Sequence, residues 1–135
     1  MIEETLSLEI FTPDGDVFKK RDIEEIVFRR KETRFEVGSE VAIFPQHGPT
    51  LIRLPVAPVR YQTHGQTHNI VFDGGYVEVK ENCVLVVTPR FEQINPKLPD
   101  ASDIAVRVAA AWQAERREFH EQMIGYEQIA KDRRP

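Results

Sequence analysis

Apolar and polar residues alternate through residues 5–88, which predicts β-strands with one buried face. In the first of these strands Leu6, Leu8 and Ile10 alternate with Ser7 and Glu9, and residues two apart lie on the same side of a strand. The stretch Thr-Pro-Asp-Gly that follows is a turn signal, because proline fixes φ and glycine accepts positive φ. Short strands with a turn about every 8–12 residues are typical of a sandwich or barrel.

Two glycine-containing dipeptides predict further turns between strands. His64-Gly65 lies between the strand-like runs 59–61 and 70–72 and predicts a hairpin. Gly74-Gly75 precedes an alternating run and predicts another turn. We therefore expect residues 1–90 to form a β-sandwich domain.

Pro55 and Pro58 interrupt the middle of this region. Proline has no N–H to donate to a neighbouring strand, so prolines within a sheet are confined to edges, strand starts and bulges. Their segment is accordingly expected at an edge or a bulge.

The hydrophobic period changes after Pro99 from two to that of an α-helix. Apolar residues then recur at steps of three, four and seven, which predicts an amphipathic helix; they are Ile104, Val108, Trp112, Phe119, Met123, Tyr126 and Ala130. Glu115 interrupts this stripe. Residues 91–100 are expected to be a linker, and residues 101–135 a helical region.

One long helix is favoured over a helical hairpin, because no proline lies between Asp100 and Arg134. The hairpin stays open as the alternative. A long exposed apolar stripe is unusual for a soluble monomer. We therefore expect the helix to fold back on the sandwich in part and to complete its burial against a partner.

Length, charge and cysteine content narrow the class of protein. The 135 residues suit one domain or a small domain with an appendage, and the net charge of −4 argues against a nucleic-acid binder. The acidic N-terminus has no apolar core of a signal peptide, and no apolar run is long enough to span a membrane. The lone Cys83 cannot form an internal disulfide, which fits a reducing compartment.

The sequence supports no catalytic or metal-binding motif. His64 and His68 have the spacing of a helical metal pair, but the expected hairpin breaks that geometry. Gly38-Ser39 lacks the Gly-Lys-Ser/Thr that completes a phosphate loop. We expect a noncatalytic protein without cofactor or metal, and a small sandwich enzyme or metal protein stays a minor alternative.

The stretch from Glu40 to Leu51 reads E-V-A-I-F-P-Q-H-G-P-T-L, an apolar strand followed by a loop stiffened by Pro45 and Pro49. Residue chemistry leaves two interpretations of His47 open. Its ring could be presented to a partner, or it could satisfy the backbone of its own loop.

The order of these segments resembles the N-terminal domain of the epsilon subunit of rotary ATP synthases. That family has E-L-G-I-x-P-G-H-A-P-L-L, then a strand with I-R, then S-G-G-F-x-E-V. In this chain the corresponding segments are E-V-A-I-F-P-Q-H-G-P-T-L, the strand-like run with Arg60, and D-G-G-Y-V-E-V. In this chain Ala42 and Gln46 replace two glycines, and Asp73 replaces serine.

The resemblance implies a flattened β-sandwich, normally followed by two helices, in a noncatalytic rotor subunit of a proton- or sodium-driven ATP synthase. Such a subunit couples the gamma shaft to the membrane carrier ring, contacts other ATP synthase subunits, and lies peripherally on the cytoplasmic face of an energy-transducing membrane. Its helices can rise along the shaft and brake ATP hydrolysis.

By position, Glu40 matches the acid that precedes the loop that the family holds near the ring, and Pro45, Gln46 and His47 match the loop itself. We expect Glu40 and His47 to lie at one end of the sandwich and to be at least partly exposed. Trp112 is expected to contact the shaft. The family motif for ATP sensing, I-D-x-x-R-A, is not preserved, because Asp103 stands four residues before Arg107. A stand-alone β-sandwich interaction module with a partner-binding helix is the alternative function.

Overall fold

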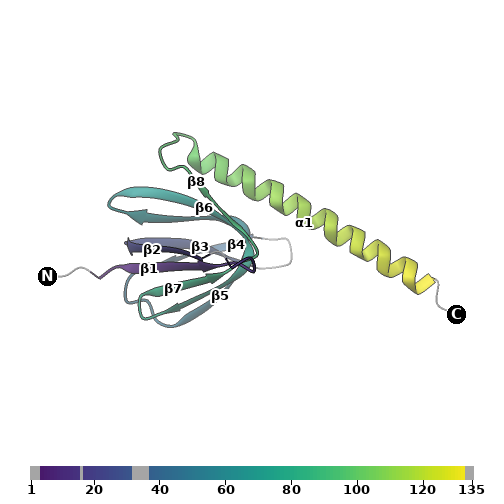
Figure 1. Ribbon diagram of the computed structural model, residues 1–135, viewed down its shortest axis with the longest axis horizontal. Helices are drawn as coiled ribbons and strands as arrows, with labels where there is room; N and C mark the ends of the chain where they lie inside the picture. The colour runs from purple at the N-terminus through teal and green to yellow at the C-terminus, as the bar shows by residue number, and fades with distance from the viewer. Residues whose placement is uncertain (1–3, 16, 32–36, 133–135) are drawn as a thin grey trace.

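The computed structural model describes residues 4–15, 17–31 and 37–132, and in this part of the chain eight strands precede one helix (Figure 1). The strands are β1 (Leu6–Phe11), β2 (Val17–Ile23), β3 (Glu25–Lys31), β4 (Val37–Ile43), β5 (Thr50–Thr63), β6 (Gln66–Lys80), β7 (Cys83–Val87) and β8 (Phe91–Ile94). The helix is α1 (Ala101–Asp132). The predicted β-sandwich followed by one long helix is confirmed.

The strands hydrogen-bond in the order β2-β1-β7-β6-β5-β3-β4, with β8 added to β6. β1 and β7 are parallel, and the other pairs are antiparallel. The sheet closes on a core of alternating residues from most strands, among which Leu8, Ile26, Phe28, Ile70 and Phe72 are fully buried. The period of two seen in the sequence therefore defines the buried face.

The expectation of a turn at Gly74-Gly75 was wrong, because both glycines lie inside the continuous strand β6. Both have positive φ, and a Cβ on Gly75 would lie 2.0 Å from the carbonyl oxygen of Val87. Two glycines let β6 bend and approach β7 closely without ending the strand. The first half of β6 pairs with β8 and its second half with β7.

β5 follows the same bend beside β6. The pairing passes from Leu54–Gly75 to Val56–Asp73, so Pro55 falls at the bend. In the described pairing, β3 pairs with β5 only at residues 60–62 of β5, which follow both prolines. The expected edge position of the Pro55 and Pro58 segment is confirmed on that side of β5.

The segment 91–100 is only partly a linker. Its first residues form β8, which pairs with β6 from Phe72–Phe91 to Asn69–Ile94. The strand region thus extends to Ile94, and residues 95–100 lead into α1.

The first half of α1 lies against the sandwich, while its C-terminal half runs past the strands (Figure 1). Ala101, Ala105, Ala109 and Trp112 are buried with Val71. Further along, exposure rises to 65% at Phe119 and 43% at Met123. The expectation that the sandwich covers the stripe only in part is therefore confirmed for the described side chains, which do not include Tyr126 and Ala130.

Candidate functional site

Three alanines dock the start of α1 on the sandwich. Ala101, Ala105 and Ala109 are spaced by four residues, so they share one face of the helix, and they pack with Val71 and Ile94. Small side chains let the helix backbone approach the sheet closely. Docking begins at Ala101, directly after the turn that follows β8.

A buried carboxylate then joins the helix to the bend of β6. Asp73, 6% exposed, precedes the two glycines of the bend. Nε of Arg116 donates to its Oδ1 at 2.9 Å, and Nη2 of Arg116 donates to its main-chain oxygen at 2.8 Å. One arginine of the helix therefore holds both the side chain and the backbone of the bend.

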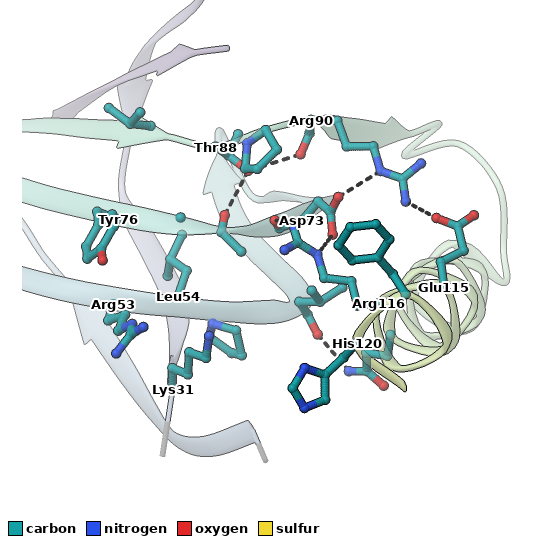
Figure 2. A pocket seen from close by; sticks show the side chains of 18 of the residues that line it. Lys31, Arg53, Leu54, Asp73, Tyr76, Thr88, Arg90, Glu115, Arg116 and His120 are labelled. Atoms are coloured by element: carbon teal, nitrogen blue, oxygen red, sulfur yellow. Dashed lines mark hydrogen bonds and ion pairs between the residues drawn. The ribbon is translucent and has the colours of Figure 1, made fainter. Parts of the chain in front are cut away.

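Arg90 completes this arrangement from the segment between β7 and β8 (Figure 2). Its Nε donates to Oδ2 of Asp73 at 2.9 Å, its Nη2 donates to Glu115, and its guanidinium lies 4.2 Å from the centre of the Trp112 ring. Burial opposes its charge, but the hydrogen bonds to Glu115 and Asp73 raise the pKa of Arg90 above its ordinary value. We call Asp73, Arg90, Trp112, Glu115 and Arg116 the clamp.

Two polar contacts outside the clamp hold the same region. Nε2 of Gln113 donates to the main-chain oxygen of Val56 at 2.6 Å. The buried Thr88 donates from Oγ1 toward the main-chain oxygens of Gly74 at 2.8 Å and Arg90 at 3.1 Å. These contacts tie β5, β6 and the β7–β8 segment to one another and to α1.

Beyond the clamp, a groove of about 1380 Å³ separates the C-terminal half of α1 from the bent end of the sandwich. One wall is α1 from Gln113 to Glu127, and the other includes Phe11, Leu54, Tyr76 and Val87. Figure 2 shows Lys31, Arg53 and Tyr76 on the sheet side, with Arg116 and His120 on the helix side.

The loop between β4 and β5 lies at the other end of the sandwich. The N–H of Gln46 donates to Oδ1 of Asn82 at 2.6 Å, and the N–H of Ser7 donates to the main-chain oxygen of Asn82 at 2.9 Å. The loop is therefore beside the start of β1, whereas Phe11, at the end of β1, lines the groove.

His47 takes part in the hydrogen bonding of its own loop. Its N–H donates to the main-chain oxygen of Phe44 at 3.2 Å, and its Nδ1 lies 2.8 Å from the main-chain oxygen of Gly48. The side chain is nevertheless only half-buried, as is that of Pro45, and Gln46 is exposed. Both sequence-based interpretations of His47 thus remain compatible with its position.

Glu40 is exposed in the middle of β4 and is paired with two arginines. Nη1 and Nη2 of Arg60 donate to its two carboxylate oxygens at 3.0 and 3.1 Å, and Nη2 of Arg29 donates to Oε1 at 3.3 Å. The hydrogen bonds and charge of Arg60, aided by the charge of Arg29, lower the pKa of Glu40. Glu40 lies before the end of its strand, so it does not share the loop end with His47 as expected.

Trp112 is buried, at 9% exposure. It belongs to the docked face of α1, and Arg90 lies over its ring. It contacts the sandwich directly, and its contact with a partner stays a prediction. The exposed part of the stripe begins farther along, at Phe119.

His64 and His68 do not share a helix face, because His64 lies in the hairpin turn and His68 lies in β6. His68 stacks on Tyr61 with ring centres 4.7 Å apart, and its Nε2 lies 2.7 Å from Oγ1 of Thr63. Burial, with a smaller effect of the Lys20 charge, lowers the pKa of His68. In the described ranges no three His, Cys, Asp or Glu side chains gather as a metal site, and no helix there is long and apolar enough to cross a membrane.

Sequence reasoning missed the clamp, since its members come from distant positions. Two signals pointed toward it. Asp73 stands where the resembling family has serine, and Glu115 interrupts the apolar stripe because it faces Arg90. The stretch from Arg29 to Glu36 looks like extra length where the resembling family has a short glycine-rich turn, and its residues 32–36 lie outside the part of the chain that the structure describes.

Comparisons with known proteins agree with the strand region. Residues 5–94 match the family described as "ATP synthase, Delta/Epsilon chain, beta-sandwich domain". The ATP synthase epsilon chain of Bacillus licheniformis is 36% identical over 88 residues, which are 65% of this chain and 62% of that protein. The ATP synthase epsilon chain of Pelotomaculum thermopropionicum is 32% identical over 117 residues, 87% of this chain and 78% of that protein.

Solved structures share the fold at lower identity. A chain of the Euglena gracilis mitochondrial ATP synthase (OSCP/F1/c-ring) superposes with a TM-score of 0.56 at 17% identity, over 69% of this chain and 56% of that chain. A chain of the Tetrahymena thermophila mitochondrial ATP synthase (central stalk and c-ring) gives 0.51 at 14% identity, over 68% and 69%.

The alignment with the Bacillus licheniformis relative spans somewhat less than two thirds of that protein's length. The family match nevertheless covers every strand from β1 to β8. This chain belongs to the ATP synthase delta/epsilon chain family.

Proposed function

We propose that this chain is a noncatalytic subunit of the central stalk of a rotary ATP synthase, where it couples the gamma shaft to the membrane carrier ring. The match of the whole strand region, residues 5–94, to the delta/epsilon sandwich carries this proposal. Solved relatives of the same fold belong to mitochondrial assemblies that contain a central stalk or a c-ring. Through the complex the chain lies peripherally at the cytoplasmic face of the membrane.

A subunit that transmits torque must be stiff between its contacts. The pairing of β5 with β6 runs from Thr50–Val79 to Thr63–Gln66 and crosses the bend, so the two halves of the sandwich share a pair of strands. Because protein interiors are close-packed and barely compressible, a displacement at one end is passed to the other. This mechanism requires packing and no reactive group.

The β4–β5 loop supplies the contact with the ring in this proposal. Pro45, Gln46 and His47 are at least partly exposed at one end of the sandwich, in a loop that Asn82 holds in place. Glu40, exposed in the middle of β4, is a second contact in this proposal, and its pair with Arg60 holds the carboxylate in place. The arrangement offers preformed polar groups to the polar loops of a ring.

The clamp bears on any braking of ATP hydrolysis by the helix. For α1 to rise along a shaft, Arg116 would leave Asp73, and Trp112 would leave the cover of Arg90 and of the sandwich. Burial of a large apolar side chain stabilises a structure by roughly 1.5–3 kcal/mol. We propose that α1 stays docked in the working complex, and that regulation through it requires release of the clamp.

Purification from native membranes tests the proposal. The chain would be tagged at its N-terminus, and the copurifying subunits would be identified by mass spectrometry. Recovery of shaft and ring subunits in fixed proportion to the chain supports a rotor subunit. Recovery of the chain with a different partner, and without ATP synthase subunits, would instead support the stand-alone interaction module.

A further inference from the structure

We infer that the groove beside the C-terminal half of α1 binds an amphipathic helix of a partner protein, one that carries carboxylates beside an apolar stripe. This inference concerns the chemistry of one contact surface and goes beyond assignment to the rotor.

The groove combines exposed apolar side chains from both walls. The helix contributes Phe119, Met123 and Ile124, exposed to 65%, 43% and 51%, and the sheet contributes Tyr76 and Val87, exposed to 52% and 51%. Apolar groups gathered on facing walls mark an interaction surface more strongly than apolar groups scattered singly. The occupant must therefore bring an apolar face.

The same groove is locally basic in an acidic chain. Its lining includes five Lys or Arg and three Asp or Glu, a formal balance of +2, against −4 for the full sequence. The basic residues are Lys31, Arg53, Arg90, Arg116 and Arg117. Complementary charge fixes the register of an interface and speeds its formation, so carboxylates are expected on the occupant.

The shape of the groove favours a helix over an added strand. Its helical wall runs from Gln113 to Glu127, which is about 21 Å at 1.5 Å per residue, or roughly four turns of a facing helix. On the sheet wall Pro55 has no N–H to donate. Backbone pairing with an incoming strand would be broken at that point, whereas a helix satisfies its own backbone.

Photo-crosslinking in the native complex tests the inference. Benzoylphenylalanine would replace Met123, in the groove, and in a matched chain Glu121, which is exposed and does not line the groove. Adducts would be mapped to a sequence segment by mass spectrometry. We expect adducts from position 123, and not from 121, within a helical segment that has acids flanking apolar residues.

Charge reversal provides the second measurement, on the full chain and the partner identified by the adduct. We expect Arg53→Glu to weaken that association about tenfold and to abolish most of its salt dependence. Arg21→Glu, an exposed arginine outside the groove, should leave the association unchanged.

Several outcomes would overturn the inference. They are equal adducts from both positions, adducts on a second copy of this chain, adducts on a strand or a basic segment, and no effect of Arg53→Glu. If ATP synthase subunits copurify while any of these is observed, only the groove assignment fails. If an acidic helix of an unrelated protein is captured, the groove assignment stands and the rotor proposal fails.

Discussion

Asp73 and Arg116 are 43 residues apart in the sequence, yet Nε of Arg116 lies 2.9 Å from Oδ1 of Asp73. This contact joins the bend of β6 to the middle of α1. With Arg90 on the other carboxylate oxygen, Asp73 makes charged hydrogen bonds to two arginines that are themselves about half-exposed. This pair holds the middle of α1 at the bend of β6.

Asp73→Asn should loosen the helix. Hydrogen bonds to charged groups contribute roughly 1.5–3 kcal/mol, so we expect about 2 kcal/mol less stability and a red shift of Trp112 emission. Chemical denaturation followed by tryptophan fluorescence measures both. Glu9→Gln, which removes an acid from a partly exposed pair with Lys19 at 3.9 Å, is the control and should change neither.

Gly75→Ala should be among the most damaging changes at a single position. An added Cβ would lie 2.0 Å from the main-chain oxygen of Val87, and φ at this residue is +116°. We expect a loss of more than about 2 kcal/mol, because backbone strain and overpacking act together. Gly48→Ala, with nothing within 4 Å of the added Cβ, should be nearly neutral in the same thermal unfolding experiment.

The stability of the sandwich should fall as the pH is lowered through the titration of His68. Its folded-state pKa lies below the ordinary value of 6.5, so protons bind the unfolded chain preferentially. The contribution is present above that value and is lost as the pH falls through the folded pKa. His68→Gln should flatten the dependence of the unfolding midpoint on pH, whereas a similar flattening by His64→Gln, in the exposed turn, would contradict this assignment.

Glu40→Ala should separate stability from assembly. The Glu40 pair with Arg60 is exposed, and such pairs contribute little to stability, so the thermal midpoint should change little. If Glu40 contacts the ring, attachment of the chain to ring-containing membranes should weaken. A large fall in the thermal midpoint with unchanged attachment would show that the residue is purely structural.

The sequence predicted those features that depend on neighbours along the chain. Alternation at Leu6, Leu8 and Ile10 gave β1, and the change of period after Pro99 gave the start of α1. The His64-Gly65 hairpin follows from the same local chemistry. Each of these features depends on which side chains a segment buries, and the local hydrophobic pattern is enough to predict that.

Features set by distant contacts were not predictable in this way. Gly74-Gly75 looked like a turn, because nothing nearby shows that β7 approaches it from across the bend. Trp112 looked like a partner contact, because its cover comes from Arg90 and the sandwich, which are distant from it in the sequence. The clamp needed the fold before its members could be recognised together.

The central claim is that this chain couples shaft rotation to ion movement, and ATP-driven ion pumping tests it most directly. Membrane vesicles lacking the chain would be assayed for ATP hydrolysis and for the ion gradient, before and after adding back the purified chain. We predict that hydrolysis without the chain fails to build a gradient, and that adding it restores the gradient. A full gradient in vesicles that lack the chain would contradict the account.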